Sequence, residues 1–176
     1  MSNPPAVEFM RFTAPDPQAQ ARAIGELREQ LQRAVQAGDT LAIADHAADL
    51  GGLLTTARQE AEALGLLREH AAAAEALPHE EPAGWYWNAY ATALQYSGER
   101  QEAERYFDKA LTLCRASGWS QLQAMVLQHW GRNLAEQRRF AEARARFEEA
   151  LALRVALGDP LQASSKAALE QLALLR

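Results

Sequence analysis

The chain has 176 residues and a formal net charge of −5, and Ala, Leu, Glu, Gln and Arg dominate its composition. These side chains lose little rotamer freedom in a helix, so the composition predicts helix along most of the chain. An acidic chain lacks the basic footprint of nucleic-acid binding, and we expect no nucleic-acid partner. The single cysteine, Cys114, excludes an intrachain disulfide.

The sequence also argues against a leader peptide and a membrane partner. The N-terminal residues lack the basic segment and apolar run of a signal peptide. No stretch reaches the roughly 18 consecutive apolar residues of a membrane-spanning helix. We therefore expect a cytoplasmic protein.

The helical pattern starts after a Pro-rich, aperiodic tail at residues 1–16. Asp16 and Pro17 form an N-cap followed by Pro at the first helical position, which predicts a helix from there to about residue 38. Apolar spacing and glycine or proline breaks predict seven more helices, at about 40–56, 58–77, 85–97, 99–116, 120–137, 139–157 and from 159 onward. The short connections predict antiparallel neighbours, and only 78–84 is a longer loop.

A repeat of 40 residues organises the second half of the chain. Residues 84–118 align without a gap with residues 124–158, so that Leu94 falls on Leu134 and Phe107 on Phe147. A weaker copy lies one period earlier, with Gly51 and Leu67 at corresponding places. A period in this range predicts a helical solenoid, in which each unit buries its face against the next.

The two strong copies resemble the tetratricopeptide repeat family. The resemblance rests on Trp87, Tyr90, Ala91, Leu94, Ala103, Phe107 and Ala110 in one copy, and on Trp130, Gly131, Leu134, Phe140, Ala143, Phe147 and Ala150 in the next. It covers about residues 44–158, and its period is longer than the family's usual period of about 34 residues. This is similar to the long-repeat variety of bacterial regulators and motor-protein light chains. The resemblance implies an all-α, right-handed solenoid of helical hairpins, with small residues where the two helices of a hairpin approach.

These patterns together predict a tail and one domain. The tail covers residues 1–16, and a single tetratricopeptide-like domain covers 17–176. Within the domain we expect an N-terminal helix, a weak repeat, two strong repeats and a C-terminal helix, at 17–38, 40–77, 84–118, 119–158 and 159–176.

The resemblance also implies a binding surface, because the first helix of each repeat lines the concave face of such solenoids. Carried over position by position, the candidate groove residues are Asp45, Asp49, Trp85, Asn88, Thr92, Tyr96, Gln128 and Arg132. The same carry-over also includes Gly52, Thr56, Gln95, Met125, His129 and Glu136. Asn88, Thr92 and Tyr96 share one helical face at a spacing of four residues. Amides can pair with the backbone of an extended ligand, and an arginine can hold a carboxylate. The alternative is that these are ordinary polar residues that face solvent.

Catalytic, cofactor and metal sites are not expected. Asp45, His46 and Asp49 lie on one helix, where we interpret them as an acidic solvated surface rather than a cation site. The sequence has no Gly-rich phosphate loop and no nucleophile motif, so we expect a protein that is not an enzyme.

Residues 7–12 form an apolar cluster, Val-Glu-Phe-Met-Arg-Phe, within the tail. Burial of each large apolar side chain stabilises by about 1.5–3 kcal/mol. We therefore predict that this cluster docks, either in the groove of its own molecule or in that of a neighbour.

The sequence predicts a non-catalytic adaptor or scaffold that binds a protein or peptide. One alternative is a regulatory module that senses a peptide or controls a transcription factor or kinase. A second is a self-assembling structural homodimer, indicated by the apolar C-terminal residues Leu161, Ala168, Leu169, Leu172, Leu174 and Leu175.

Overall fold

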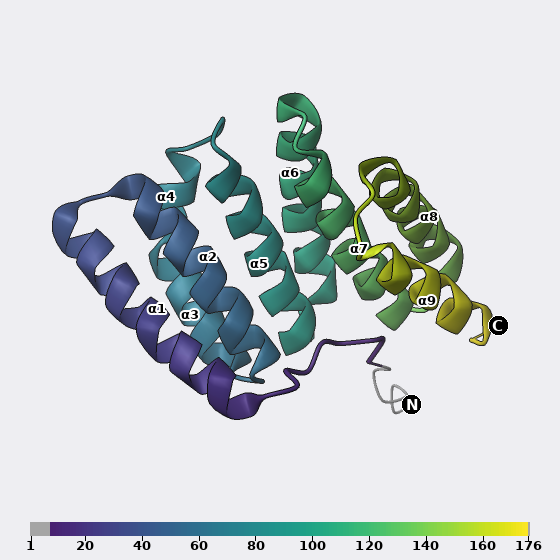
Figure 1. Cartoon of the computed structure of the whole chain (residues 1–176), viewed down its shortest axis with the longest axis horizontal. Coiled ribbons are helices and arrows are strands. Elements are labelled where there is room, and N and C mark those ends of the chain that lie inside the picture. Colours follow the sequence, from purple (N-terminus) through teal and green to yellow (C-terminus); the bar gives the residue numbers. More distant parts are fainter. Residues whose placement is uncertain (1–7, 176) are drawn as a thin grey trace. The chain divides into compact units, whose positions relative to one another are not determined.

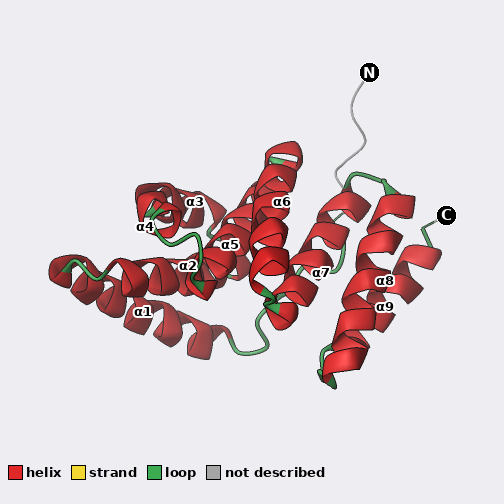
Figure 2. Ribbon diagram, turned by 90° about the horizontal axis from the view of Figure 1, so that it is seen from above, coloured by secondary structure: helices red, strands yellow, loops and turns green. Residues whose placement is uncertain are grey.

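The computed structural model describes residues 8–175, and all regular structure in that range is helical (Figures 1 and 2). The all-α fold class is thus confirmed for the described residues. The helices are α1 (Pro17–Ala37), α2 (Thr40–Thr56), α3 (Glu60–Glu69), α4 (Ala71–Glu75), α5 (Glu81–Ser97), α6 (Arg100–Ser117), α7 (Ser120–Glu136), α8 (Phe140–Leu157) and α9 (Gln162–Ala173).

The described chain forms two compact units, and the residues of unit 2 lie in the sequence between the two stretches that make up unit 1. Unit 1 contains residues 8–11 and 120–175, and unit 2 contains residues 12–119. The first described residues therefore belong with α7, α8 and α9, although α1–α6 separate them in the chain. The domain boundaries predicted above remain predictions.

In unit 2, α5 is the central helix, and it contacts α2, α3, α4 and α6. It is apolar on almost every side, as expected for a helix that is covered all round. Tyr86, Trp87 and Leu94 are all buried on it. The Tyr86 hydroxyl donates a hydrogen bond to the Leu67 carbonyl of α3, which satisfies a polar group inside the core.

Unit 1 is built from α7 packed on α8 and α8 packed on α9. Leu122, Leu127 and Leu134 form the buried side of α7, and Leu172 is buried on α9. Gly158, with a left-handed backbone, follows α8. It allows the sharp reversal of the chain between α8 and α9.

The hairpins are held by close approach between a small residue on the first helix and a large residue on the second. A methyl group added to Gly131 of α7 would lie 2.5 Å from the Phe147 ring of α8. The same addition at Gly51 of α2 would lie 2.7 Å from the Leu67 side chain of α3. These pairs are separated by two periods of the repeat, so the structure confirms the predicted role of the small residues.

The turn inside each hairpin contains one residue with positive φ. These residues are Arg58 at 62°, Gly98 at 94° and Arg138 at 61°, again one period apart. An L-residue in the left-handed region costs about 1 kcal/mol. Two of the three positions carry arginine, which has no preference for this conformation. The packing of the hairpin, rather than the residue type, therefore fixes the backbone here.

The weak repeat differs from the prediction. The expected helix at 58–77 is divided at His70 into α3 and α4, so the described residues contain nine helices rather than eight. Helix α5 begins at Glu81, inside the loop expected at 78–84, because Pro82 in the first turn needs no hydrogen bond for its nitrogen. Helix α9 begins at Gln162, and the Asp159 carboxylate accepts from the Leu161 amide at 2.8 Å just before it.

We predict that Gly131→Ala lowers the free energy of unfolding by about 1–3 kcal/mol, because the rigid Phe147 ring leaves no space for a methyl group. The matched control is Gly52→Ala, where the added methyl has no neighbour within 4 Å. That change should stabilise by about 0.5–1 kcal/mol through helix propensity. Urea unfolding followed by circular dichroism measures both, and a neutral Gly131→Ala would contradict the proposed close packing.

Candidate functional site

The predicted groove residues on α2 are two carboxylates. Asp49 is exposed and Asp45 is partly exposed. Partial burial raises the pKa of Asp49, and the neighbouring Asp45 charge raises it further, while His46 opposes both effects. The two side chains give α2 a negative surface, and the described residues contain no cluster of three potential metal ligands.

The predicted groove residues on α5 divide into accessible and buried positions. Trp85 and Thr92 are partly exposed, whereas Asn88 and Tyr96 are buried. The Thr92 hydroxyl donates to the Asn88 carbonyl at 2.8 Å, one turn earlier in the helix. Arg58 lies over the Tyr96 ring, with 5.2 Å between the guanidinium carbon and the ring centroid. The accessible part of this face is therefore Trp85 and Thr92.

The predicted groove residues on α7 also differ in their exposure. Arg132 is partly exposed, but Gln128 is buried, and its side-chain oxygen accepts from the Ser165 hydroxyl of α9 at 2.7 Å. Gln128 thus takes part in an internal contact between α7 and α9.

A buried arginine on α8 joins the same internal network. Arg154 is 2% exposed, and its Nη1 donates to the Ser165 hydroxyl at 2.8 Å and to the Leu161 carbonyl at 3.1 Å. The Asp159 carboxylate lies 3.9 Å from its Nε. Sequence reasoning missed this residue. The available signal was that Arg154 stands one period after Cys114, a buried and apolar position.

His129 of α7 is held neutral by this environment. Its pKa is lowered to about 3, mainly by burial and in addition by the nearby positive charges of Arg132 and Arg154. The imidazole therefore serves as an uncharged side chain at neutral pH.

The N-terminal segment, residues 8–12, provides the best-defined contact with the ends of the helices. Arg11 donates to the Glu136 carboxylate through Nε at 2.7 Å and Nη2 at 2.8 Å, a paired geometry that only arginine can make. The Arg11 side chain is 5% exposed and that of Glu136 is 0% exposed. The Phe9 amide also donates to Glu136, at 3.3 Å.

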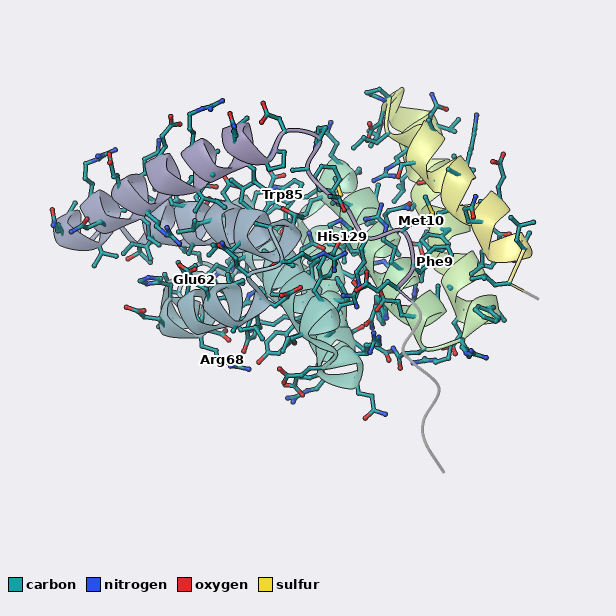
Figure 3. All side chains as sticks on the ribbon, turned by 90° about the horizontal axis from the view of Figure 1, so that it is seen from below. Phe9, Met10, Glu62, Arg68, Trp85 and His129 are labelled. Carbon is teal, nitrogen blue, oxygen red and sulfur yellow. The ribbon has the colours of Figure 1, made fainter. Side chains whose placement is uncertain are left out.

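The aromatic residue of this segment packs on α8. The Phe9 ring stacks on Phe147 with 5.9 Å between ring centroids, and Phe9 is 4% exposed. Figure 3 labels Phe9 and the adjacent Met10. Docking within the same chain is thus confirmed for Phe9. The Phe12 ring is exposed, and Val7 lies outside the described residues.

Equivalent positions of successive repeats accept hydrogen bonds from the N-terminal part of the chain. Thr56, Tyr96 and Glu136 are one period apart, and each ends or nearly ends the first helix of its repeat. Glu136 accepts from the Phe9 amide, the Tyr96 hydroxyl from the Phe12 amide at 2.9 Å, and the Thr56 hydroxyl from the Gln20 side chain at 2.8 Å. Two of these three donors are backbone amides in an irregular stretch. The last turn of the first helix is therefore a contact position for extended chain.

Comparison with known proteins agrees with this architecture. Residues 81–156 match the model of the tetratricopeptide repeat family. The crystal structure of BtubC (BKLC) from P. vanneervenii is similar, with a TM-score of 0.70 and 20% identity over 88% of this chain. This chain covers 65% of that one, and the similarity shows a shared all-α solenoid fold. No curated protein matches the sequence.

We predict that Arg11→Ala lowers the free energy of unfolding by about 3 kcal/mol, because it leaves the buried Glu136 carboxylate without its cationic partner. Arg105→Ala is the control, since Arg105 forms an exposed pair with Glu102 and should cost less than about 1 kcal/mol. Chemical unfolding at neutral pH measures both. Equal effects would show that the Arg11–Glu136 pair contributes no more than a surface pair.

We also predict a pH effect from His129. Its pKa is about 3 in the folded chain and about 6.5 when unfolded, so its contribution is complete above pH 6.5 and is lost as the pH falls toward 3. Between pH 7 and pH 5, the natural chain should lose about 1–2 kcal/mol more stability than His129→Gln. The exposed His79, changed to Gln, is the control. Parallel stability curves for the natural chain and His129→Gln would contradict the assignment.

Proposed function

We propose that this chain, in which residues 81–156 belong to the tetratricopeptide repeat family, is a non-catalytic adaptor that binds an extended segment of a partner protein. The observation that supports this most directly is the use of positions 96 and 136 to hold backbone amides of an irregular stretch. Preformed helices bind such a segment without a large ordering cost on their own side.

The accessible side chains beside these positions suit a polypeptide ligand. Thr92 on α5 can exchange hydrogen bonds with peptide groups, and Arg132 on α7 can hold a carboxylate. The carboxylates Asp45 and Asp49 would favour basic residues. We place this activity in the cytoplasm, without a cofactor and without a nucleic-acid or membrane partner. Within the described residues, none of the helices combines the length and apolarity needed to cross a membrane.

The regulatory alternative uses the same surface and differs in its consequence. An adaptor links two proteins without altering them, whereas a regulator changes the activity of the transcription factor or kinase that it binds. An assay of the captured partner with and without the chain separates these roles.

We predict that affinity capture from native extract recovers a partner with the full chain and loses at least part of it with variants of the accessible residues. The variants are Arg132→Gln in unit 1 and the pair Asp45→Asn with Asp49→Asn in unit 2. The control is Arg105→Gln. The Arg105 side chain is 75% exposed but lies on α6, the second helix of its repeat, whereas the candidate residues lie on first helices.

Melting curves of every variant are measured alongside, so that loss of binding is not confused with loss of folding. A partner kept by both sets of variants but lost with Arg105→Gln would contradict binding by the first helices. Recovery of the bait alone would favour the homodimer.

The homodimer is a second candidate, because large apolar side chains are exposed near the end of the described chain. These are Val155, Leu157, Leu161, Leu174 and Leu175, and Leu174 is 76% exposed. The burial of such side chains between two copies would stabilise a symmetric pair.

We predict that the mass measured by sedimentation equilibrium rises with concentration, and that the double change Leu161→Glu with Leu174→Glu abolishes the rise. Leu41→Glu is the control, since Leu41 is 46% exposed but lies on α2 of unit 2. A constant monomer mass for the natural chain would remove the homodimer candidate.

A further inference from the structure

The surface formed by Glu136 of α7 and Phe147 of α8, here called the Glu136 site, has two complementary parts. The Phe147 ring supplies an apolar part, on which Phe9 stacks. The Glu136 carboxylate supplies a polar part, which receives the Arg11 guanidinium and the Phe9 amide. The two parts are filled by residues two positions apart in the N-terminal segment.

The polar part selects arginine. The carboxylate side chain is 0% exposed, and a buried charge of this kind requires a partner that satisfies both of its oxygens. The two donors of Arg11 reach Oε1 and Oε2 separately, at 2.7 and 2.8 Å. A lysine ammonium is a single point charge and cannot reproduce this geometry.

The apolar part selects an aromatic residue. Phe9 lies with its ring 27° from the plane of Phe147, and close packing of Phe147 against Gly131 fixes the orientation of that ring. The Phe9 amide contact with Glu136 then fixes the direction of the segment. The spacing between the aromatic residue and the arginine is therefore part of the recognition.

The N-terminal segment contacts the Glu136 site without forming regular secondary structure. Residues 8–16 form no helix, and both Glu8 and the Phe12 ring, on either side of the docked residues, are exposed. Met10 between the two docked residues has a φ of 47°, a left-handed backbone that a methionine adopts only at a cost. Such a stretch opens more readily than the helices that it contacts.

We propose that the Glu136 site binds, from a partner protein, an extended segment in which an aromatic residue precedes an arginine by two positions. Residues 9–11 are the resident competitor that this segment displaces. The inference rests on the proposed function and deepens it by naming the chemistry of the partner. Because residues 9–11 are covalently linked to the domain, their effective concentration at the site is on the order of millimolar. A partner segment must therefore bind more tightly than residues 9–11 or bind after they have left the site.

The test uses the full chain with its own segment disabled by Phe9→Ala and Arg11→Ala. The probe is a fluorescent peptide with the sequence of residues 6–14, AVEFMRFTA. Fluorescence anisotropy should show binding to this variant about tenfold or more tighter than to the natural chain, in which the site is filled. The same peptide with alanine in place of its arginine should lose about tenfold or more in affinity.

The site is identified by adding Glu136→Gln to the disabled variant, which should abolish binding. Phe12→Ala in the natural chain is the matched control, because the Phe12 ring is exposed and its removal should not admit the peptide. Equal affinity for the natural and disabled chains, or for the peptides with and without arginine, would overturn the proposal.

A second measurement covers the case in which the disabled variant is too unstable. The milder Arg11→Lys change keeps a cation beside Glu136, and the peptide should raise the melting temperature of that variant but not of Arg11→Lys with Glu136→Gln. Absence of this rescue would overturn the proposal.

The outcomes separate this inference from the proposed function. Capture of a partner that survives Glu136→Gln, together with no peptide binding, would overturn the inference and leave the adaptor function standing. A dimer of the natural chain that is lost with Phe9→Ala and Arg11→Ala would show the neighbour's segment as occupant, and would also overturn it.

Discussion

The close approach of Gly131 to the Phe147 ring is the constraint on which unit 1 depends. With no Cβ at position 131, the ring of α8 lies directly against the backbone of α7. The hairpin is thereby closed, and one face of the ring is left for Phe9. Glu136, little more than one turn further along α7, lies where it can bond both the backbone and the arginine of the same segment. A larger residue at position 131 would alter the hairpin and the docking surface together.

Unit 1 also contains two buried charged residues, Glu136 and Arg154. Arg154 connects α8 to the start of α9, and Glu136 is neutralised by Arg11. Buried charges are expensive to desolvate and rarely improve stability over apolar residues. Both charges here have partners of matching geometry. Arg154 bonds the Leu161 carbonyl and the Ser165 hydroxyl, and Glu136 receives two donors of Arg11.

The sequence predicted the repeat, most helix bounds and the small residues of the hairpins, because all three follow from local periodicity. It did not predict the division at His70, since both flanking stretches are rich in good helix formers. It treated Gln128 as a groove residue because its position matched the family, but its partner Ser165 lies on a different helix. The apolar cluster at residues 7–12 predicted docking, whereas the recipient, Glu136, is 125 residues from Arg11 and appears only in the folded chain.

Amide hydrogen exchange at Phe9 and Phe12, resolved by NMR, tests most directly whether the ends of the first helices hold extended chain. The account predicts that both amides exchange slowly compared with an unstructured peptide, because they donate to Glu136 and Tyr96. It also predicts that Glu136→Gln increases the exchange rate of the Phe9 amide more than that of the Phe12 amide. Exchange of both amides at the rate of an unstructured peptide would contradict the docking on which the account rests.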